Sequence, residues 1–96
     1  MSVALFVQIE LKPGQREAFA RRVTEHRQNV LSKEAYCQRF DVLIPEDIDS
    51  TVCLYEVYDD EAGFKAHAET PHMQEYRNDT NDMIVDRKRI LSTIVE

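Results

Sequence analysis

A block of twenty residues, Leu54–Met73, places a strand, a helix, a helix break and two histidines in close succession. Its first five residues are rich in branched and aromatic side chains and predict a β-strand, and an aspartate pair after them can cap a helix. Thr70-Pro71 ends that helix and begins another, because proline fits the first turn of a helix. His67 and His72 therefore flank a break, which lets two imidazoles approach one cavity from different directions.

The amino-terminal part of the chain predicts a strand followed by a helix. Val3–Leu11 alternates apolar residues with a mixed set, which is the period of a β-strand. After a turn at Lys12-Pro13-Gly14, a helix is predicted to run to about Ser32. The apolar stripe of this helix recurs at spacings of four, three and four residues and comprises Phe19, Val23, His26 and Val30. His26 is thus expected to face the sheet.

Two further strands are predicted at Tyr36–Ile44 and Thr51–Tyr58, joined by a polar loop as an antiparallel hairpin. If the loop is symmetric, Arg39 pairs across from Glu56. The alternation places Phe40 on one face of the first of these strands. The residues predicted on its opposite face are Cys37, Arg39, Asp41 and Leu43.

The carboxyl-terminal part completes an α+β pattern. Helices are predicted at about Asp60–Glu69 and Pro71–Asp82, and a last strand from Ile84 or Val85 to Val95. The order β-α-β-β-α-β with two right-handed crossovers describes a ferredoxin-like fold, with a four-stranded antiparallel sheet in a single domain of residues 1–96. Helices cover only one face of such a sheet. The other face carries Phe6 and is expected to pack against a second copy of the chain.

Charge and hydropathy exclude several classes of partner. The chain has 12 Lys and Arg residues against 18 Asp and Glu, and its net charge of −6 opposes binding to nucleic acid or to an anionic membrane. No apolar run approaches the roughly 18 to 20 residues that span a bilayer. Met1-Ser2-Val3 leads directly into a strand pattern with no basic leader region, so a cytoplasmic location is expected.

The sequence contains no recognisable motif for a metal or a nucleotide cofactor. Cys37 and Cys53 lie sixteen residues apart without a Cys-x-x-Cys spacing, and no two histidines have the His-x-x-x-His spacing of a helical metal site. Gly14 and Gly63 are the only glycines, so there is no glycine-rich phosphate loop, and no Gly-x-Ser-x-Gly elbow is present. We therefore predict that the protein binds no metal and no flavin, NAD or ATP.

The histidines are the leading candidates for catalysis, because imidazole exchanges protons near neutral pH. His67 follows Phe64 by three residues and shares its helix face, which must look toward the sheet if Phe64 belongs to the core. His67 or His26 is the predicted base, and His72 and Glu56 are predicted to orient the substrate or relay protons. For each histidine the alternative is a structural role: a core residue at His26, or a residue that fixes the helix break at His72.

Three further residues are predicted to bind substrate. Phe64 and Tyr76 offer flat surfaces for an aromatic ligand, and a phenol also supplies one polar tip. Arg39 either forms a cross-strand ion pair with Glu56, worth roughly 0.2 to 1 kcal/mol, or lies with it at the floor of a pocket. Ordinary packing in the sheet and helices remains the alternative for the aromatic residues.

Nearly the whole chain resembles the antibiotic biosynthesis monooxygenase family. The resemblance rests on the strand that ends in Lys12-Pro13-Gly14, the helix around Phe19, the segment Tyr36–Val42 and the block Leu54–Met73. It implies a homodimeric α+β barrel with a site between helices and sheet in each protomer. The enzymes among these relatives include monooxygenases that oxidise quinols or polyketide anthrones without flavin or metal.

The family's motifs map onto individual residues of this chain. His67 and His72 match the histidines of the family's Phe-x-x-His-x-x-Thr-Pro-His pattern, and Glu56 matches the acid of its Tyr-Glu-x-Tyr strand. The chain departs from the family in two places. It lacks the tryptophan on which haem-degrading relatives depend, and Glu34-Ala35-Tyr36-Cys37 stands where the family usually has a Glu-Pro-Gly-Cys turn.

Three functions are compatible with the sequence. The leading hypothesis is a cofactor-independent monooxygenase that uses molecular oxygen on a small quinol-like, phenolic or enolisable substrate. The alternatives are an isomerase of a small phosphorylated dione, because the chain also resembles a quorum-signal isomerase in its Arg-Phe-Asp-Val and Thr-Pro-His segments, and a binding or stress protein without catalysis. The last predicts histidines that are all held in structural hydrogen bonds. An isomerase needs convergent cations, for which the candidates are Arg39, Lys65, Arg77 and Arg87.

Overall fold

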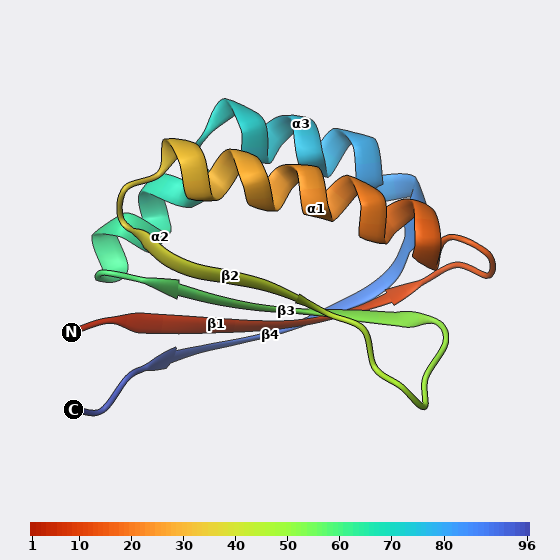
Figure 1. Ribbon diagram of the computed structural model, residues 1–96, viewed down its shortest axis with the longest axis horizontal. Helices are drawn as coiled ribbons and strands as arrows, with labels where there is room; N and C mark the ends of the chain where they lie inside the picture. Colours follow the sequence, from red (N-terminus) through yellow and green to blue (C-terminus); the bar gives the residue numbers. More distant parts are fainter.

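The computed structural model describes all residues from Met1 to Glu96 and has two layers, with the helices on one side of a single sheet (Figure 1). The sheet has the strand order β2-β3-β1-β4, and all its neighbouring strands are antiparallel. This is the predicted ferredoxin-like α+β fold. The elements in chain order are β1 (Val3–Leu11), α1 (Arg16–Lys33), β2 (Cys37–Leu43), β3 (Thr51–Tyr58), α2 (Glu61–Ala68), α3 (Pro71–Thr80), η1 (Asn81–Met83) and β4 (Ile84–Thr93).

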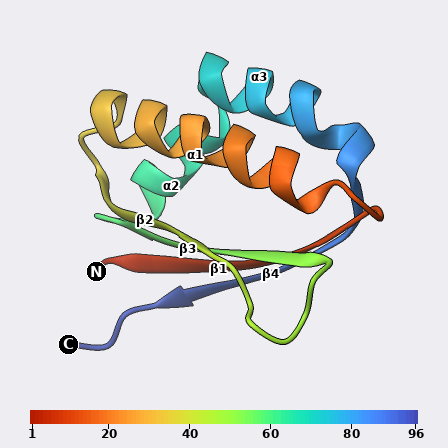
Figure 2. The same ribbon diagram turned by 45° about the vertical axis from the view of Figure 1, so that its right-hand side comes forward.

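Helix α1 packs on the sheet through the predicted stripe. Phe19, Val23, His26 and Val30 are its four buried residues. The helix lies over β2 and beside α3, whereas α2 covers one end of β3 (Figures 1 and 2). Both views show all three helices on the same side of the sheet. Helix α3 stops at Thr80, short of the predicted Asp82, because a 3₁₀ turn, η1, leads the chain into β4.

The hairpin between β2 and β3 differs from the prediction in register. Phe40 pairs with Glu56, and Arg39 pairs with Val57, so the predicted partnership of Arg39 with Glu56 is wrong. The pairing also shifts between Cys37 and Arg39, where β2 contains one additional residue. Such a bulge turns the residues before it to the other face of the sheet, and Cys37 therefore joins Phe40 in the core instead of lying opposite it.

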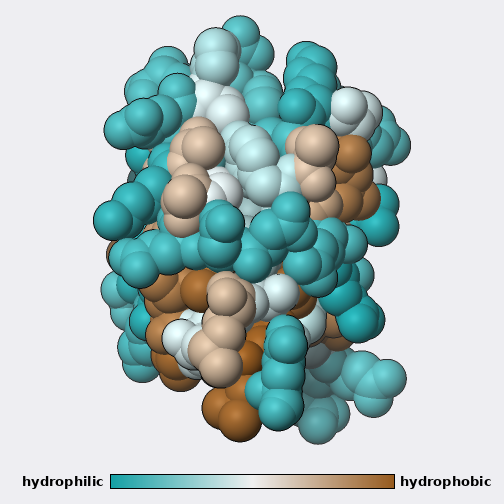
Figure 3. Space-filling model, turned by 90° about the vertical axis from the view of Figure 1, so that its left-hand side faces the viewer, coloured by the Kyte–Doolittle hydropathy of each residue, from teal (hydrophilic) through white to brown (hydrophobic).

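The face of the sheet without helices remains open in a single chain. Phe6 and Tyr55 are half-buried there, and Ile90 is 64% exposed. Figure 3, which looks at the end of the molecule with both termini, shows hydrophobic residues gathered toward the sheet, while the helical layer is largely hydrophilic. The predicted homodimer would cover this face. No helix has the length and apolar character needed to cross a membrane, and the cytoplasmic location remains a prediction.

Candidate functional site

A cavity lies between the helical layer and the sheet and is lined by residues from both layers. The cavity has a volume of about 50 Å³ and lies in a recess that is open to solvent. Apolar residues of β1, β2 and β3 form its floor. The predicted site residues His26, Phe64, His67 and Tyr76 line it from the helices, and Glu56 lines it from β3. The sequence therefore identified the majority of the polar and aromatic lining.

A buried carboxylate connects the two histidines that flank the helix break. Glu34, at the carboxyl-terminal cap of α1, is only 2% exposed. Its Oε1 accepts a hydrogen bond from His67 Nδ1 at 2.8 Å, and its Oε2 is hydrogen-bonded to His72 Nε2. The two imidazoles thus meet at one acid, but only His67 lines this cavity, whereas His72 lies at a separate surface recess beside Tyr36 and Thr70. The sequence reasoning assigned no role to Glu34, although it is the one acidic residue kept from the family's Glu-Pro-Gly-Cys turn.

Local capping fixes the position of each histidine. Asp60 accepts a hydrogen bond from the Gly63 backbone at 2.8 Å and so begins α2. Thr70 caps α3 through the Met73 backbone and donates its hydroxyl hydrogen to the His67 carbonyl at 3.0 Å. With proline at the first position of α3, these bonds hold the end of one helix against the start of the next.

A glycine lets α2 approach the connection between α1 and β2 closely. A Cβ atom at Gly63 would lie 3.0 Å from the Tyr36 Cβ, which is closer than ordinary van der Waals contact. Tyr36 follows Glu34 by two residues. The absent side chain at Gly63 therefore lets His67, one turn later on α2, reach Glu34.

The pairing with Glu34 sets the protonation of the site. Burial alone raises the pKa of the Glu34 carboxyl, but hydrogen bonds from His67 and His72 outweigh that effect and hold the pKa below its ordinary value. Glu34 is therefore a carboxylate at neutral pH and accepts the Nδ1 hydrogen of His67. In the tautomer that has this hydrogen on Nδ1, the lone pair of the His67 ring lies on Nε2, which has no hydrogen bond to the protein.

A second acid faces that nitrogen. Glu56 of β3 is 3% exposed, and its Oε1 lies 3.7 Å from His67 Nε2. The hydroxyl of Tyr58 donates to the same oxygen at 2.6 Å. Burial raises the pKa of Glu56 even though the bond from Tyr58 acts in the opposite direction. A carboxyl with a raised pKa thus lies next to the His67 imidazole.

His26 occupies the same cavity without a hydrogen-bond partner. It is 1% exposed, and both of its ring nitrogens lack any partner. Its ring stacks on Tyr76 at 4.2 Å between centroids and meets the edge of Phe40 at 5.6 Å. Burial, followed by the nearby imidazoles of His67 and His72, lowers its pKa to about 3. His26 is therefore a neutral imidazole with two unused hydrogen-bonding atoms.

Comparison with known proteins identifies the family of this chain. Residues 2–79 match the model of the family described as "Antibiotic biosynthesis monooxygenase". The chain belongs to this family. No significant match was found among curated proteins.

Two solved structures that carry the family's name illustrate how well the fold is preserved. A Bacteroides thetaiotaomicron protein is 23% identical with a TM-score of 0.90, over 99% of this chain and 90% of that one. A Nitrosomonas europaea protein is 26% identical with a TM-score of 0.89, over 94% and 86% of the two chains. In this member, His67 and His72 both contact Glu34, and Glu56 lies 3.7 Å from His67.

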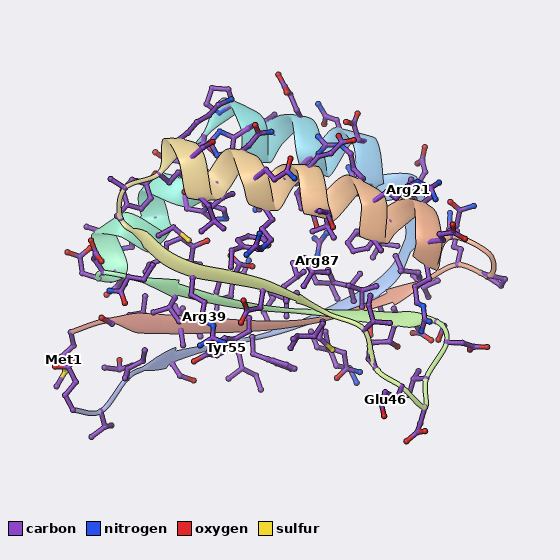
Figure 4. All side chains as sticks on the ribbon, in the orientation of Figure 1. Met1, Arg21, Arg39, Glu46, Tyr55 and Arg87 are labelled. Carbon is purple, nitrogen blue, oxygen red and sulfur yellow. The ribbon has the colours of Figure 1, made fainter.

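Among the predicted substrate-binding residues, Phe64 and Tyr76 line the cavity and Arg39 does not. Arg39 lies on the open face of the sheet, where it forms an ion pair with Asp41 and lies over the Tyr55 ring (Figure 4). The physical reason is the register of the hairpin, which turns Arg39 and Glu56 to opposite faces. Of the other candidate cations, Arg77 and Arg87 line the cavity and are joined by Arg89, whereas Lys65 pairs with Glu61.

Neither metal ligands nor reactive thiols are evident in this family member. No group of three or more His, Cys, Asp or Glu side chains is arranged to hold a metal ion. Cys37 and Cys53 are buried free thiols, and burial raises the pKa of both, that of Cys37 to about 11. Both therefore remain protonated at neutral pH and do not act as nucleophiles.

Proposed function

We propose that this protein is a cofactor-independent monooxygenase of a small quinol-like, phenolic or enolisable substrate, with His67 as the base. One observation carries the proposal: Glu34 holds His67 by Nδ1, which leaves Nε2, 3.7 Å from the cavity residue Glu56, without a hydrogen bond to the protein. The orienting carboxylate is the arrangement that makes an imidazole an effective base, and such a base contributes roughly 10²- to 10⁴-fold in rate.

The proposed reaction begins with proton transfer from the substrate to His67 Nε2. The resulting electron-rich anion passes one electron to oxygen, and the two radicals combine to form a carbon–oxygen bond. Protonation of the outer oxygen and loss of water leave a carbonyl group on the substrate. For a methylene carbon the balance is CH₂ + O₂ → C=O + H₂O, so the oxidant is oxygen itself.

Other residues support these proton transfers. Glu56, with its raised pKa, can supply a proton to the departing oxygen and recover one from His67. His72 holds the second oxygen of Glu34 and so fixes the carboxylate that orients the base. His26 offers a hydrogen bond to the substrate, and the ring surfaces of Phe64 and Tyr76 offer apolar contact.

The test is oxygen uptake by chelator-treated protein with a panel of quinols and anthrones. We expect consumption of one oxygen molecule per substrate molecule at a rate that chelation leaves unchanged. No uptake with any member of the panel, or activity that requires an added metal or flavin, would overturn the proposal.

An isomerase of a phosphorylated dione is the second candidate. It is favoured by the arginines that line the cavity, and it begins with the same proton abstraction. Conversion of such a dione without oxygen uptake would select it. A purely binding protein predicts histidines fully held in structural bonds, and the partnerless nitrogens of His26 argue against that role.

We also propose that the protein is a homodimer, formed through the open face of the sheet. Half-buried Phe6 and exposed Ile90 lie there, and a small domain has little stability to spare. Light scattering should report about twice the chain mass of 11.2 kDa at micromolar concentration. A stable, folded monomer at that concentration would contradict this assembly.

A further inference from the structure

Three arginines stand at the side of the cavity that meets solvent. Arg77 comes from α3 and is half-buried, whereas Arg87 and Arg89 come from β4 and are exposed. On β4 these two pair with Ile9 and Val7, so they lie on the face of the sheet that the helices cover. Figure 4 shows Arg87 between the helical layer and the sheet.

These three are the arginines whose guanidinium groups have no partner in the protein. The chain has eight arginines, and the other five each donate a side-chain hydrogen bond. None of the three cavity arginines forms an ion pair or a side-chain hydrogen bond, and Arg89 lies over the ring of Phe64, 5.9 Å from its centroid. In a chain with a net charge of −6, unpaired cations gathered at one cavity mark a place that attracts an anion.

The size of the cavity also indicates that a substrate reaches the arginines. An apolar cavity of about 150 Å³ holds a benzene molecule. A cavity volume of about 50 Å³ therefore takes only part of a ring, and the remainder of a substrate must extend into the open recess. That recess is where the arginines lie.

We propose that the substrate carries a permanent anionic group, a carboxylate or a phosphate, that Arg77, Arg87 and Arg89 bind while the reactive carbon faces His67. Guanidinium groups suit this task because their planar donors match both anions in pairs. The assignment rests on the proposed function for the position of the reacting end. The anion site itself does not depend on the reaction, because it is defined by the arginines.

Calorimetric titration tests the site without turnover, using phenol, 2-hydroxybenzoate and phenyl phosphate as probes. We expect one or both anions to bind at least about tenfold more tightly than phenol, a difference of about 1.4 kcal/mol. The two anions distinguish a carboxylate site from a phosphate site. Arg87→Met and Arg89→Met should each reduce that preference severalfold.

Lys88→Met provides the matched control. Lys88 lies between the two arginines in sequence but pairs with Gln8, which places it on the opposite face of the sheet. The variant removes the same charge from the same strand but on the other face of the sheet, so it should retain the full preference. Equal binding of phenol and both anions, or equal losses in Lys88→Met and Arg87→Met, would overturn the proposal. If the protein prefers the anions over phenol but consumes no oxygen, the monooxygenase assignment would be overturned and the anion site would stand.

Discussion

Two imidazole environments share one cavity and differ in almost every physical respect. His67 is bonded to the Glu34 carboxylate at 2.8 Å, so its tautomer and orientation are set. His26 lies 5.9 Å away between ring centroids and has no partner on either nitrogen. Burial, followed by the neighbouring imidazoles, lowers its pKa to about 3. The two side chains are both buried but differ in their hydrogen-bond partners, and the roles proposed for them follow from that difference: proton transfer for His67 and substrate contact for His26.

The strongest way to break this comparison is His67→Asn. The asparagine amide can still donate to Glu34 from the position of Nδ1, but it lacks the ring nitrogen Nε2. Turnover should fall at least about a hundredfold. The melting temperature should change by only a few degrees. Full activity, or activity that falls only with the fraction of folded protein, would give His67 a structural role.

Glu34→Gln should have the next largest effect. The amide cannot accept hydrogen bonds from both His67 and His72, so the base loses its fixed tautomer and turnover should fall about tenfold or more. The variant should also lose about 1 to 3 kcal/mol of unfolding free energy at neutral pH.

The pH dependence of this loss identifies its origin. Because the folded-state pKa of Glu34 lies below its ordinary value of 4.5, its ionised form stabilises the fold above that pH. The contribution disappears as the pH falls through the folded-state pKa. The difference between wild type and Glu34→Gln in unfolding free energy should therefore shrink in acid. A difference independent of pH would contradict the ionised pair.

His26→Phe sharpens the comparison from the other side. Because burial lowers the pKa of His26 from 6.5 to about 3, the unfolded chain takes up a proton first as the pH falls. Above pH 6.5 this difference in pKa has no effect on the free energy of unfolding of the wild type. Between pH 6.5 and pH 3 it lowers that free energy as the pH falls, with a slope of about 1.4 kcal/mol per pH unit in the steep part. The variant should show a slope smaller by about that amount in urea titrations, while turnover falls by less than tenfold.

A loss of turnover in His26→Phe as large as that in His67→Asn would exchange the roles of the two imidazoles. His26→Asn serves as the matched variant, because it also removes the titrating group but keeps a polar side chain. Both variants should flatten the pH dependence of stability.

The smallest effect is expected at Gly63→Ala. Alanine gains about 1 kcal/mol of helix propensity, but its Cβ would lie 3.0 Å from the Tyr36 Cβ. We expect a net loss of about 1 kcal/mol in unfolding free energy and a severalfold loss of turnover, since α2 must move and carry His67 away from Glu34. Ala62→Gly, at an exposed position of the same helix, controls for propensity. A more stable Gly63→Ala would show that the close approach is not required.

The sequence predicted those parts of the molecule that local patterns encode. Strand alternation and helix spacing located every major element and placed His26 on the buried stripe. The register of the hairpin was not accessible, because the position of one additional residue in β2 determines which face Arg39 occupies. Glu34 was missed because it meets His67 across 33 residues of chain, a separation that no local periodicity reports.

The arginines on β4 show the same limit. The predicted strand made Arg87 one candidate cation among four, but only the pairing of β4 with β1 places it and Arg89 on the side of the helices. Both also lie beyond the residues that match the family model. The sequence shows which residues of an alternating strand are charged. It does not show which of them face the cavity, because the cavity forms only when the helices pack on the sheet.

The central claim is that His67 generates the substrate anion that oxygen attacks. Stopped-flow absorbance under anaerobic conditions tests it most directly, with an anthrone or quinol whose anion absorbs apart from the neutral form. The account predicts that wild-type protein produces the anion without metal or flavin, and that His67→Asn binds the same substrate but leaves it neutral. Equal anion formation by the two proteins, or none by the wild type while oxygen is consumed in air, would contradict it.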